Sequence, residues 1–268
     1  MGMALVATPV WAAEDALQWL IRMDQTMRTQ NYQGTVVYQY GDHIETMNVR
    51  HGYSQGRERE FMQSVNSDGH ETVRDGDEVM CIMHKYKTGM VMTLHGDASI
   101  LPMFSSEALQ TVGQHYEVSL VNIGNKPVTR IAGRSCDWLL VTPRDKLRFG
   151  YRICLDQVVK LPLKMEINNQ GKMLEALMFT EVSFPKVFDN NAWRSTINTQ
   201  SFSVQHETKP APVPKSQANK WRLESLPPGF KVVNKGFTSG GKENPQHWEH
   251  RMSVSDGLAT VSVFLSPV

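Results

Sequence analysis

Apolar side chains recur at three- and four-residue spacing between residues 14 and 29, where Leu17, Leu20 and Ile21 fall on one face. This period predicts an amphipathic helix. Two acidic residues occupy its first turn, where negative charge favours the helix dipole. The stretch Asn31-Tyr32-Gln33-Gly34 indicates where the helix ends.

Beyond this helix, short runs of alternating apolar and polar residues are separated by turn residues such as Gly41-Asp42-His43. Such runs predict strands and hairpins. We expect strands over residues 35–40, 44–50, 57–65, 70–74, 78–85, 90–95, 116–123, 129–131, 135–142, 147–155, 163–167, 173–180 and 201–205. Many short strands with one clear helix predict a mainly β (α+β) fold, with a large curved antiparallel sheet and covering helices.

Residues 97–113 lose this alternation. The segment is apolar at Ile100, Leu101, Met103 and Phe104 but contains a proline and two serines, which indicates a long loop with a short helix. Long irregular connections inside a domain are usually functional or mobile. We expect these four residues to form a mobile lid over the concave face of the sheet; the alternative is an ordinary surface loop.

A Pro-rich stretch gives the strongest signal for a domain boundary. Residues 206–220 read HETKPAPVPKSQANK, which is typical of a semi-extended linker. We expect a signal-peptide remnant at 1–13, a large domain at 14–206, the linker at 207–219, and a small β-rich α+β C-terminal domain at 220–268. A module of the size of this last domain is marginally stable on its own.

Composition narrows the classes of function. Lys and Arg number 28 against 27 Asp and Glu, a net charge of +1, which argues against a broad nucleic-acid interface. No apolar run reaches the ~18 residues of a membrane span. The first residues, MGMALVATPVWAA, are similar to the end of a secretory signal. This favours a location outside the cytoplasm, and a plain N-terminal extension is the alternative.

Motifs of enzymes and metal sites are not recognisable. We interpret Ser239-Gly240-Gly241-Lys242 as a turn, and His247 and His250 as surface histidines without a third ligand at zinc-site spacing. We therefore expect no catalytic residues, no metal and no cofactor.

The cysteines predict a covalent link. Cys136 and Cys154 lie at equal distances from Asp145, the centre of a predicted turn. A symmetric hairpin would place them opposite each other, within reach of a disulfide. Three free buried cysteines are the alternative, and Cys81 is expected to act as a small buried hydrophobe.

Alternation along the strands assigns a concave apolar face. Its methionines suit a cavity for variable acyl chains, although a core filled by flexible side chains explains them equally well. The expected cavity residues are Val36, Tyr38, Met90, Met92, Leu94, Leu139, Val141, Phe149, Tyr151, Ile153, Leu163 and Met165.

Several stretches together resemble the RseB/MucB family, periplasmic regulators of the envelope-stress sigma factor in Gram-negative bacteria. They are Asn31–Tyr38 (NYQGTVVY), Asp68–Arg74 (DGHETVR), Arg148–Asp156 (RFGYRICLD), Leu161–Lys164 (LPLK), Pro228–Phe230 (PGF) and Ser255–Phe264 (SDGLATVSVF). Their order and spacing carry the resemblance through both expected domains.

The resemblance implies a half-open barrel similar to that of lipoprotein carriers, which makes the large domain at 14–206 a lipid-sensing half-barrel. Members of the family continue beyond the stretch Ser255–Phe264, so the small domain is expected to be incomplete. It also implies that the chain binds the periplasmic region of an inner-membrane anti-sigma factor and shields it from proteolysis. Lipid, lipopolysaccharide or mislocalised lipoprotein would release this protection. Partner contacts are expected at Trp221, Phe230, Trp248 and Leu258 of the small domain. A lipid or lipoprotein carrier and a periplasmic hydrolase are the competing functions, and association of two copies is left open.

Overall fold

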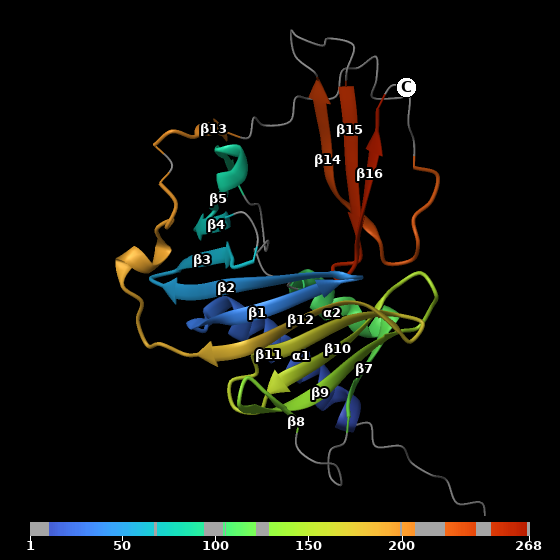
Figure 1. Ribbon diagram of the computed structural model, residues 1–268. Coiled ribbons are helices and arrows are strands. Elements are labelled where there is room, and N and C mark those ends of the chain that lie inside the picture. The colour runs from blue at the N-terminus through green and yellow to red at the C-terminus, as the bar shows by residue number, and fades with distance from the viewer. Residues whose placement is uncertain are drawn as a thin grey trace, which may run out of the picture.

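Two β-sheets of unequal size dominate the computed structural model, which describes residues 11–66, 69–93, 104, 106–121, 129–198, 200–206, 223–239 and 248–266. The larger has 13 strands and the smaller has three (Figure 1). The larger sheet does not close into a barrel, because β7 and β13 form its two ends. The expectation of a mainly β fold with an open, curved sheet is confirmed.

The large sheet has the order β13-β6-β5-β4-β3-β2-β1-β12-β11-β10-β9-β7, and β8 also pairs with β9. Its strands are β1 (Tyr32–Tyr40), β2 (His43–Ser54), β3 (Arg57–Ser64), β4 (His70–Asp75), β5 (Glu78–Met83), β6 (Thr88–Thr93), β7 (Tyr116–Leu120), β8 (Thr129–Ile131), β9 (Arg134–Pro143), β10 (Gly150–Asp156), β11 (Pro162–Asn169), β12 (Lys172–Ser183) and β13 (Ser203–His206). A short 3-10 turn, η1 (His84–Tyr86), joins β5 to β6.

One strand departs from the expected antiparallel arrangement. β13 pairs with β6 in parallel. After β12 the chain crosses the outer face of β2–β4 through η2 (Asn190–Trp193), where Arg50 donates a 2.9 Å hydrogen bond to the Ala192 carbonyl. A long crossover of this kind is what a parallel pair requires, so β13 reaches β6 from the far side of the sheet.

The helices cover one face of the large sheet. They are α1 (Trp11–Thr29) and α2 (Ser106–His115). Leu20 and Met23 of α1 and Val112 of α2 are buried against the sheet in one continuous core. The predicted helix at 14–29 lies within α1, and α2 supplies the short helix expected in residues 97–113.

The small sheet comprises β14 (Lys231–Ser239), β15 (Trp248–Ser255) and β16 (Thr260–Leu265) in that order. Figure 1 shows it standing out from the large sheet and meeting it at one end. Its own core is small and contains Phe230, Met252 and Val254. Among the described residues, no helix is long and apolar enough to cross a membrane.

Candidate functional site

The helix-covered face of the large sheet holds most of the predicted cavity residues. Cross-strand pairs such as Val141 with Tyr151, and Leu139 with Ile153, place these side chains on one face. Seven of them are buried in a packed core: Val36, Leu139, Val141, Tyr151, Ile153, Leu163 and Met165. They are thus covered by the helices rather than exposed in an open cavity.

A small apolar cavity remains between α1 and strands β11 and β12. Its volume is about 20 Å³, and it is lined by Met27, Tyr32, Leu161, Pro162, Met165, Leu177 and Phe179. Ligand sites for small organic molecules usually span ~300–1,000 Å³. An acyl chain therefore enters this core only if side chains now filling it move.

The remaining cavity predictions meet different outcomes. Tyr38 and Met92 are half-buried. Met90 and Phe149 are 38 % and 41 % exposed, so placing them in an enclosed cavity was wrong. Phe149 precedes the first paired residue of β10, whereas Met90 lies on β6 near the end of the sheet. Leu94 lies outside the described residues.

The predicted lid is described at one residue, Phe104, which is only 4 % exposed. Its ring meets that of Tyr151 edge-on, with centroids 5.3 Å apart, and Arg28 of α1 donates a 3.1 Å hydrogen bond to its carbonyl. Phe104 therefore packs over the apolar face of the sheet, and its role in a mobile lid stays a prediction. Ile100, Leu101 and Met103 lie outside the described residues.

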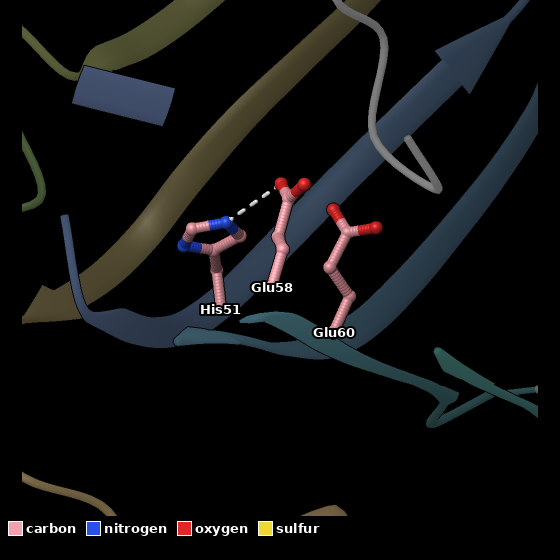
Figure 2. Close-up of side chains that lie close together, drawn as sticks. All are labelled: His51, Glu58 and Glu60. Carbon is pink, nitrogen blue, oxygen red and sulfur yellow. Dashed lines mark hydrogen bonds and ion pairs between the residues drawn. The ribbon is translucent and has the colours of Figure 1, made fainter. Parts of the chain in front are cut away.

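A buried polar network interrupts the same face in the β2–β4 half of the sheet. His51 is fully buried, and its two ring nitrogens lie 2.8 Å from the Gln30 carbonyl and 3.0 Å from a Glu58 oxygen (Figure 2). Both partner atoms are hydrogen-bond acceptors. Arg74 lies 3.1 Å from the carboxylates of both Glu58 and Glu60.

The ligand atoms of His51, Glu58 and Glu60 lie close enough together to surround a metal ion. The Arg74 guanidinium, however, already bridges the two carboxylates. A buried carboxylate needs such a cationic partner, so the guanidinium accounts for the cluster without an added ion. We interpret the cluster as an ion-pair network that holds strands β2, β3 and β4 together, not as a metal centre.

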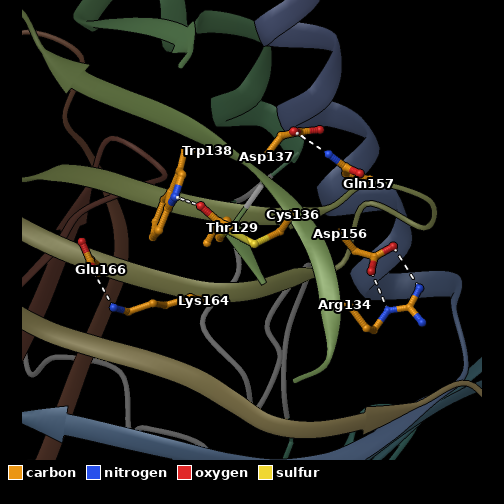
Figure 3. Close-up of a disulfide and its surroundings, with 10 residues drawn as sticks. Thr129, Arg134, Cys136, Asp137, Trp138, Asp156, Gln157, Lys164 and Glu166 are labelled. Carbon is orange, nitrogen blue, oxygen red and sulfur yellow. Dashed lines mark hydrogen bonds and ion pairs between the residues drawn. A yellow bond between two sulfur atoms is a disulfide. The ribbon is translucent and has the colours of Figure 1, made fainter. Parts of the chain in front are cut away.

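A disulfide joins β9 to β10 on the opposite face of the sheet (Figure 3). Cys136 and Cys154 have a Cα–Cα distance of 5.4 Å. They are not directly opposite, because Cys136 pairs with Asp156 and Cys154 with Trp138. The symmetric register was therefore wrong by two residues, a shift that keeps every side chain on its predicted face. Cys81 is free and half-buried.

The two sheets meet around a buried ion pair. Arg148, in the loop before β10, lies 2.7 Å from Asp256, in the turn between β15 and β16. The side chains of Arg148 and Asp256 are 0 % and 1 % exposed. Arg148 also donates to the Pro228 carbonyl and lies over the Phe230 ring, 5.0 Å from its centroid.

Asp256 is surrounded by donors. The backbone N–H groups of Leu258 and Ala259 donate to one carboxylate oxygen, at 3.0 and 2.8 Å, and the Tyr116 hydroxyl donates to the other at 3.0 Å. Burial alone raises the pKa of the Asp256 carboxyl, but these hydrogen bonds and that from Arg148 outweigh it, so the pKa lies below its ordinary value.

Two further contacts complete the region where the two sheets meet. We call this region the joint; its residues are Arg148, Asp256, Tyr116, Tyr151, Leu258 and Gly229. The Tyr151 hydroxyl donates a 2.9 Å hydrogen bond to the Leu258 carbonyl. Gly229 has a φ of +83°, and a Cβ placed there would lie 2.2 Å from His115, so the close approach needs glycine. The joint thus connects β7, the β9–β10 loop and α2 to the small sheet.

The predicted partner contacts lie largely within this joint. Phe230 is 8 % exposed beneath Arg148, and Leu258 is half-buried against the large core. Both therefore contact the chain's own large sheet, and their surfaces are mostly unavailable to a partner in this arrangement. Trp221 lies outside the described residues, as does the side chain of Trp248.

Sequence reasoning did not single out Arg148, Asp256 or Tyr116. The first two lie in the stretches RFGYRICLD and SDGLATVSVF, and Pro228–Phe230 is a third such stretch. These three stretches, distant along the chain, converge at the joint. The available signal was their shared resemblance to one family.

Comparisons with known proteins agree with that resemblance. The family model of the MucB/RseB N-terminal domain matches residues 15–202, and that of the MucB/RseB C-terminal domain matches residues 215–268. The chain belongs to the MucB/RseB family. Membership identifies it with regulatory proteins and not with enzymes.

Individual relatives of the MucB/RseB family support this assignment. The sigma factor AlgU regulatory protein MucB of Pseudomonas aeruginosa is 30 % identical over 267 residues, which cover 99 % of this chain and 78 % of that protein. The sigma-E factor regulatory protein RseB of Escherichia coli K12 is 24 % identical, covering 91 % and 73 %.

A crystal structure of MucB in complex with MucA(peri) has a TM-score of 0.70 and 26 % identity, covering 95 % of this chain and 80 % of that one. The complex of Pseudomonas aeruginosa MucA and MucB gives 0.69 and 26 %, covering 93 % and 79 %. The likeness therefore includes both sheets of this MucB/RseB family member.

The disulfide predicts a stability difference. Cys136 and Cys154 close a loop 18 residues apart in sequence. The chain-entropy model values such a loop at about 3 kcal/mol, so we expect the Cys136→Ala/Cys154→Ala variant to unfold at correspondingly lower urea concentration. Cys81→Ala should unfold at the parental concentration. Equal stability of the parent with and without reductant would contradict the prediction.

We expect the contact between Arg148 and Asp256 to weaken at acidic pH. Because the folded-state pKa of Asp256 is lowered, its stabilisation is present at neutral pH and is lost as pH falls below the ordinary carboxyl value of about 3.9. At neutral pH, Asp256→Asn should lower the opening free energy of β14–β16 by about 3 kcal/mol, measured by hydrogen exchange.

Asp145→Asn is the matched control for Asp256→Asn. Asp145 also pairs with Arg148, but its side chain is 34 % exposed, and ion pairs with exposed groups contribute at most about 1 kcal/mol. Equal effects of the two substitutions would show that burial at Asp256 does not stabilise the joint.

The ion-pair network around His51 should stabilise the half of the large sheet that contains β2, β3 and β4. Arg74→Met removes the cation from between Glu58 and Glu60, so we expect a loss of about 3–5 kcal/mol in unfolding free energy. Arg57→Met, on the more exposed pair with Asp75, should cost less than about 1 kcal/mol. A chelator that destabilises the parent as much as Arg74→Met does would favour a metal centre.

Proposed function

We propose that the chain is a periplasmic regulator that binds the periplasmic part of a membrane anti-sigma factor and protects it from proteolysis. The observation that carries this proposal is the likeness of both sheets to MucB solved in complex with MucA(peri). Regulatory relatives that match 91–99 % of the chain support it. Binding of the anti-sigma segment would silence the envelope-stress sigma factor by keeping its inhibitor intact.

The proposed division into 14–206 and 220–268 gives each part a role. We propose that the anti-sigma segment binds mainly the small domain, held by the joint in a defined place beside the large sheet. A pre-arranged surface loses less entropy on binding than two freely moving halves. The buried Arg148–Asp256 pair would therefore increase the affinity for the partner without itself contacting the partner.

We further propose that the helix-covered face of the large sheet responds to lipid. The packed core is apolar and the sheet is open at both ends. On the same face, the half-buried Met62 and Met92 and the more exposed Met90 provide flexible side chains that adapt to an acyl chain. Lipid that enters this core would displace present contacts and release the partner.

Calorimetry with a purified periplasmic segment of a MucA-type anti-sigma factor tests the proposal. We expect one-to-one binding and slower cleavage of that segment by a protease when this chain is present. Added lipopolysaccharide should weaken the binding. The control is a detergent, used at the same ratio of its concentration to its critical micelle concentration. Lipid binding with no affinity for the anti-sigma segment would contradict the proposal and favour a lipid or lipoprotein carrier.

A further inference from the structure

Tyr151 connects the helix-covered core of the large sheet to the small sheet. The residue lies on β10 and is 5 % exposed. Its ring packs edge-on against Phe104, and its hydroxyl donates to the Leu258 carbonyl in the β15–β16 turn. One rigid side chain therefore contacts both the packing beneath the helices and the backbone of the other sheet.

Phe104 is fixed from a second direction. Its carbonyl accepts a hydrogen bond from Arg28 of α1, and Arg28 forms an ion pair with Asp24 one turn earlier. The ring of Phe104 thus fills space between α1 and the sheet. Because protein cores are densely packed, an acyl chain placed in this core has to displace a side chain of this size.

The residue that accepts the Tyr151 hydrogen bond, Leu258, also contacts Asp256 in the joint. Leu258 donates its N–H to Asp256 and accepts from Tyr151 through its carbonyl. A change in the χ1 angle of Tyr151 swings the whole ring and moves its hydroxyl away from that carbonyl. The loss loosens the same turn that presents Asp256 to Arg148.

We propose that Phe104 and Tyr151 couple the packing of the helix-covered core to the position of the small sheet. Displacement of Phe104 by an acyl chain frees the Tyr151 ring, weakens its bond to Leu258 and loosens the joint. This inference rests on the lipid response of the proposed function and names the residues that transmit it. It defines Tyr151 as a positioning residue.

The expected size of the coupling follows from one hydrogen bond. A ligand shifts an equilibrium only by its difference in affinity for the two states. A single neutral hydrogen bond changes an equilibrium by about two- to tenfold. The remaining Arg148 and Tyr116 contacts hold the joint when Tyr151 is released, so lipid loosens the small sheet without detaching it.

Hydrogen exchange at the Leu258 and Ala259 amides reads out the joint directly. The probe is a lysophosphatidylcholine with a 14-carbon chain, used below its critical micelle concentration, and native mass spectrometry reports whether it binds. We expect bound lipid to accelerate exchange at these amides about two- to tenfold in the parent. In Tyr151→Phe the amides should exchange faster without lipid and show no further acceleration with it.

Tyr116→Phe is the matched control. This substitution removes the hydrogen bond from the Tyr116 hydroxyl to Asp256. It leaves the contacts of Tyr151 with Phe104 and Leu258 in place. This variant should also exchange faster at rest, yet keep the parental response to lipid. Equal responses of Tyr151→Phe and the parent to bound lipid would overturn the proposal.

Phe104→Ala tests the coupling without any ligand. Removal of the ring should accelerate exchange at Leu258 and Ala259, whereas Val112→Ala, which trims a similarly buried residue of α2, should leave these amides near the parental rate. If lipid does not bind at all, the proposed lipid response fails, while the Phe104→Ala result still decides the coupling. Parental exchange in a folded Phe104→Ala variant would overturn it.

Discussion

The buried ion pair between Arg148 and Asp256 is the interaction on which the arrangement of the two sheets depends. A carboxylate at 1 % exposure is tolerated only because its oxygens receive hydrogen bonds from Arg148, Tyr116 and two backbone N–H groups. These donors come from both sheets, so the charge is satisfied only when the sheets are correctly placed. The hydrogen-bond requirement of this one carboxylate therefore favours a single placement of the small sheet beside the large one.

The same joint links the core to the surface at which a partner is proposed to bind. The large sheet is stabilised internally by its helix-covered core, by the Cys136–Cys154 disulfide and by the ion pairs around Arg74. The small sheet has a core of three buried apolar residues, and its contacts with the large sheet supplement that core. A change in the large core is therefore able to reach the small sheet through few contacts, with Tyr151 among them.

Local patterns predicted local structure well. The 3.6-residue period located the N-terminal helix, and alternation assigned Leu139, Val141, Tyr151 and Ile153 to the buried face. The hairpin register was wrong by two residues, because the loop before β10 is not symmetric about Asp145. The strand at 201–205 was expected, but its parallel pairing with β6 was not, since the partner of an edge strand depends on the path of the chain and not on its own residues.

Long-range partners were the least predictable part of the site. Arg148 and Asp256 are 108 residues apart, and nothing in either stretch alone indicates that they meet. Phe104 was expected in a lid because its neighbours in sequence are apolar and irregular, and its contacts with Arg28 and Tyr151 could not be foreseen from those neighbours. A small β-rich domain was expected at 220–268, but strands β14 and β15 were not predicted individually, because their residues lack a clear alternating pattern.

Nuclear spin relaxation of backbone amides in the free protein tests the central claim most directly. It reports the rotational tumbling time of each sheet separately. If the Arg148–Asp256 joint holds the molecule together, amides of β9–β12 and of β14–β16 report one common tumbling time, which separates into two when Asp256 is replaced by asparagine. A markedly shorter tumbling time for β14–β16 in the unaltered protein would contradict the account.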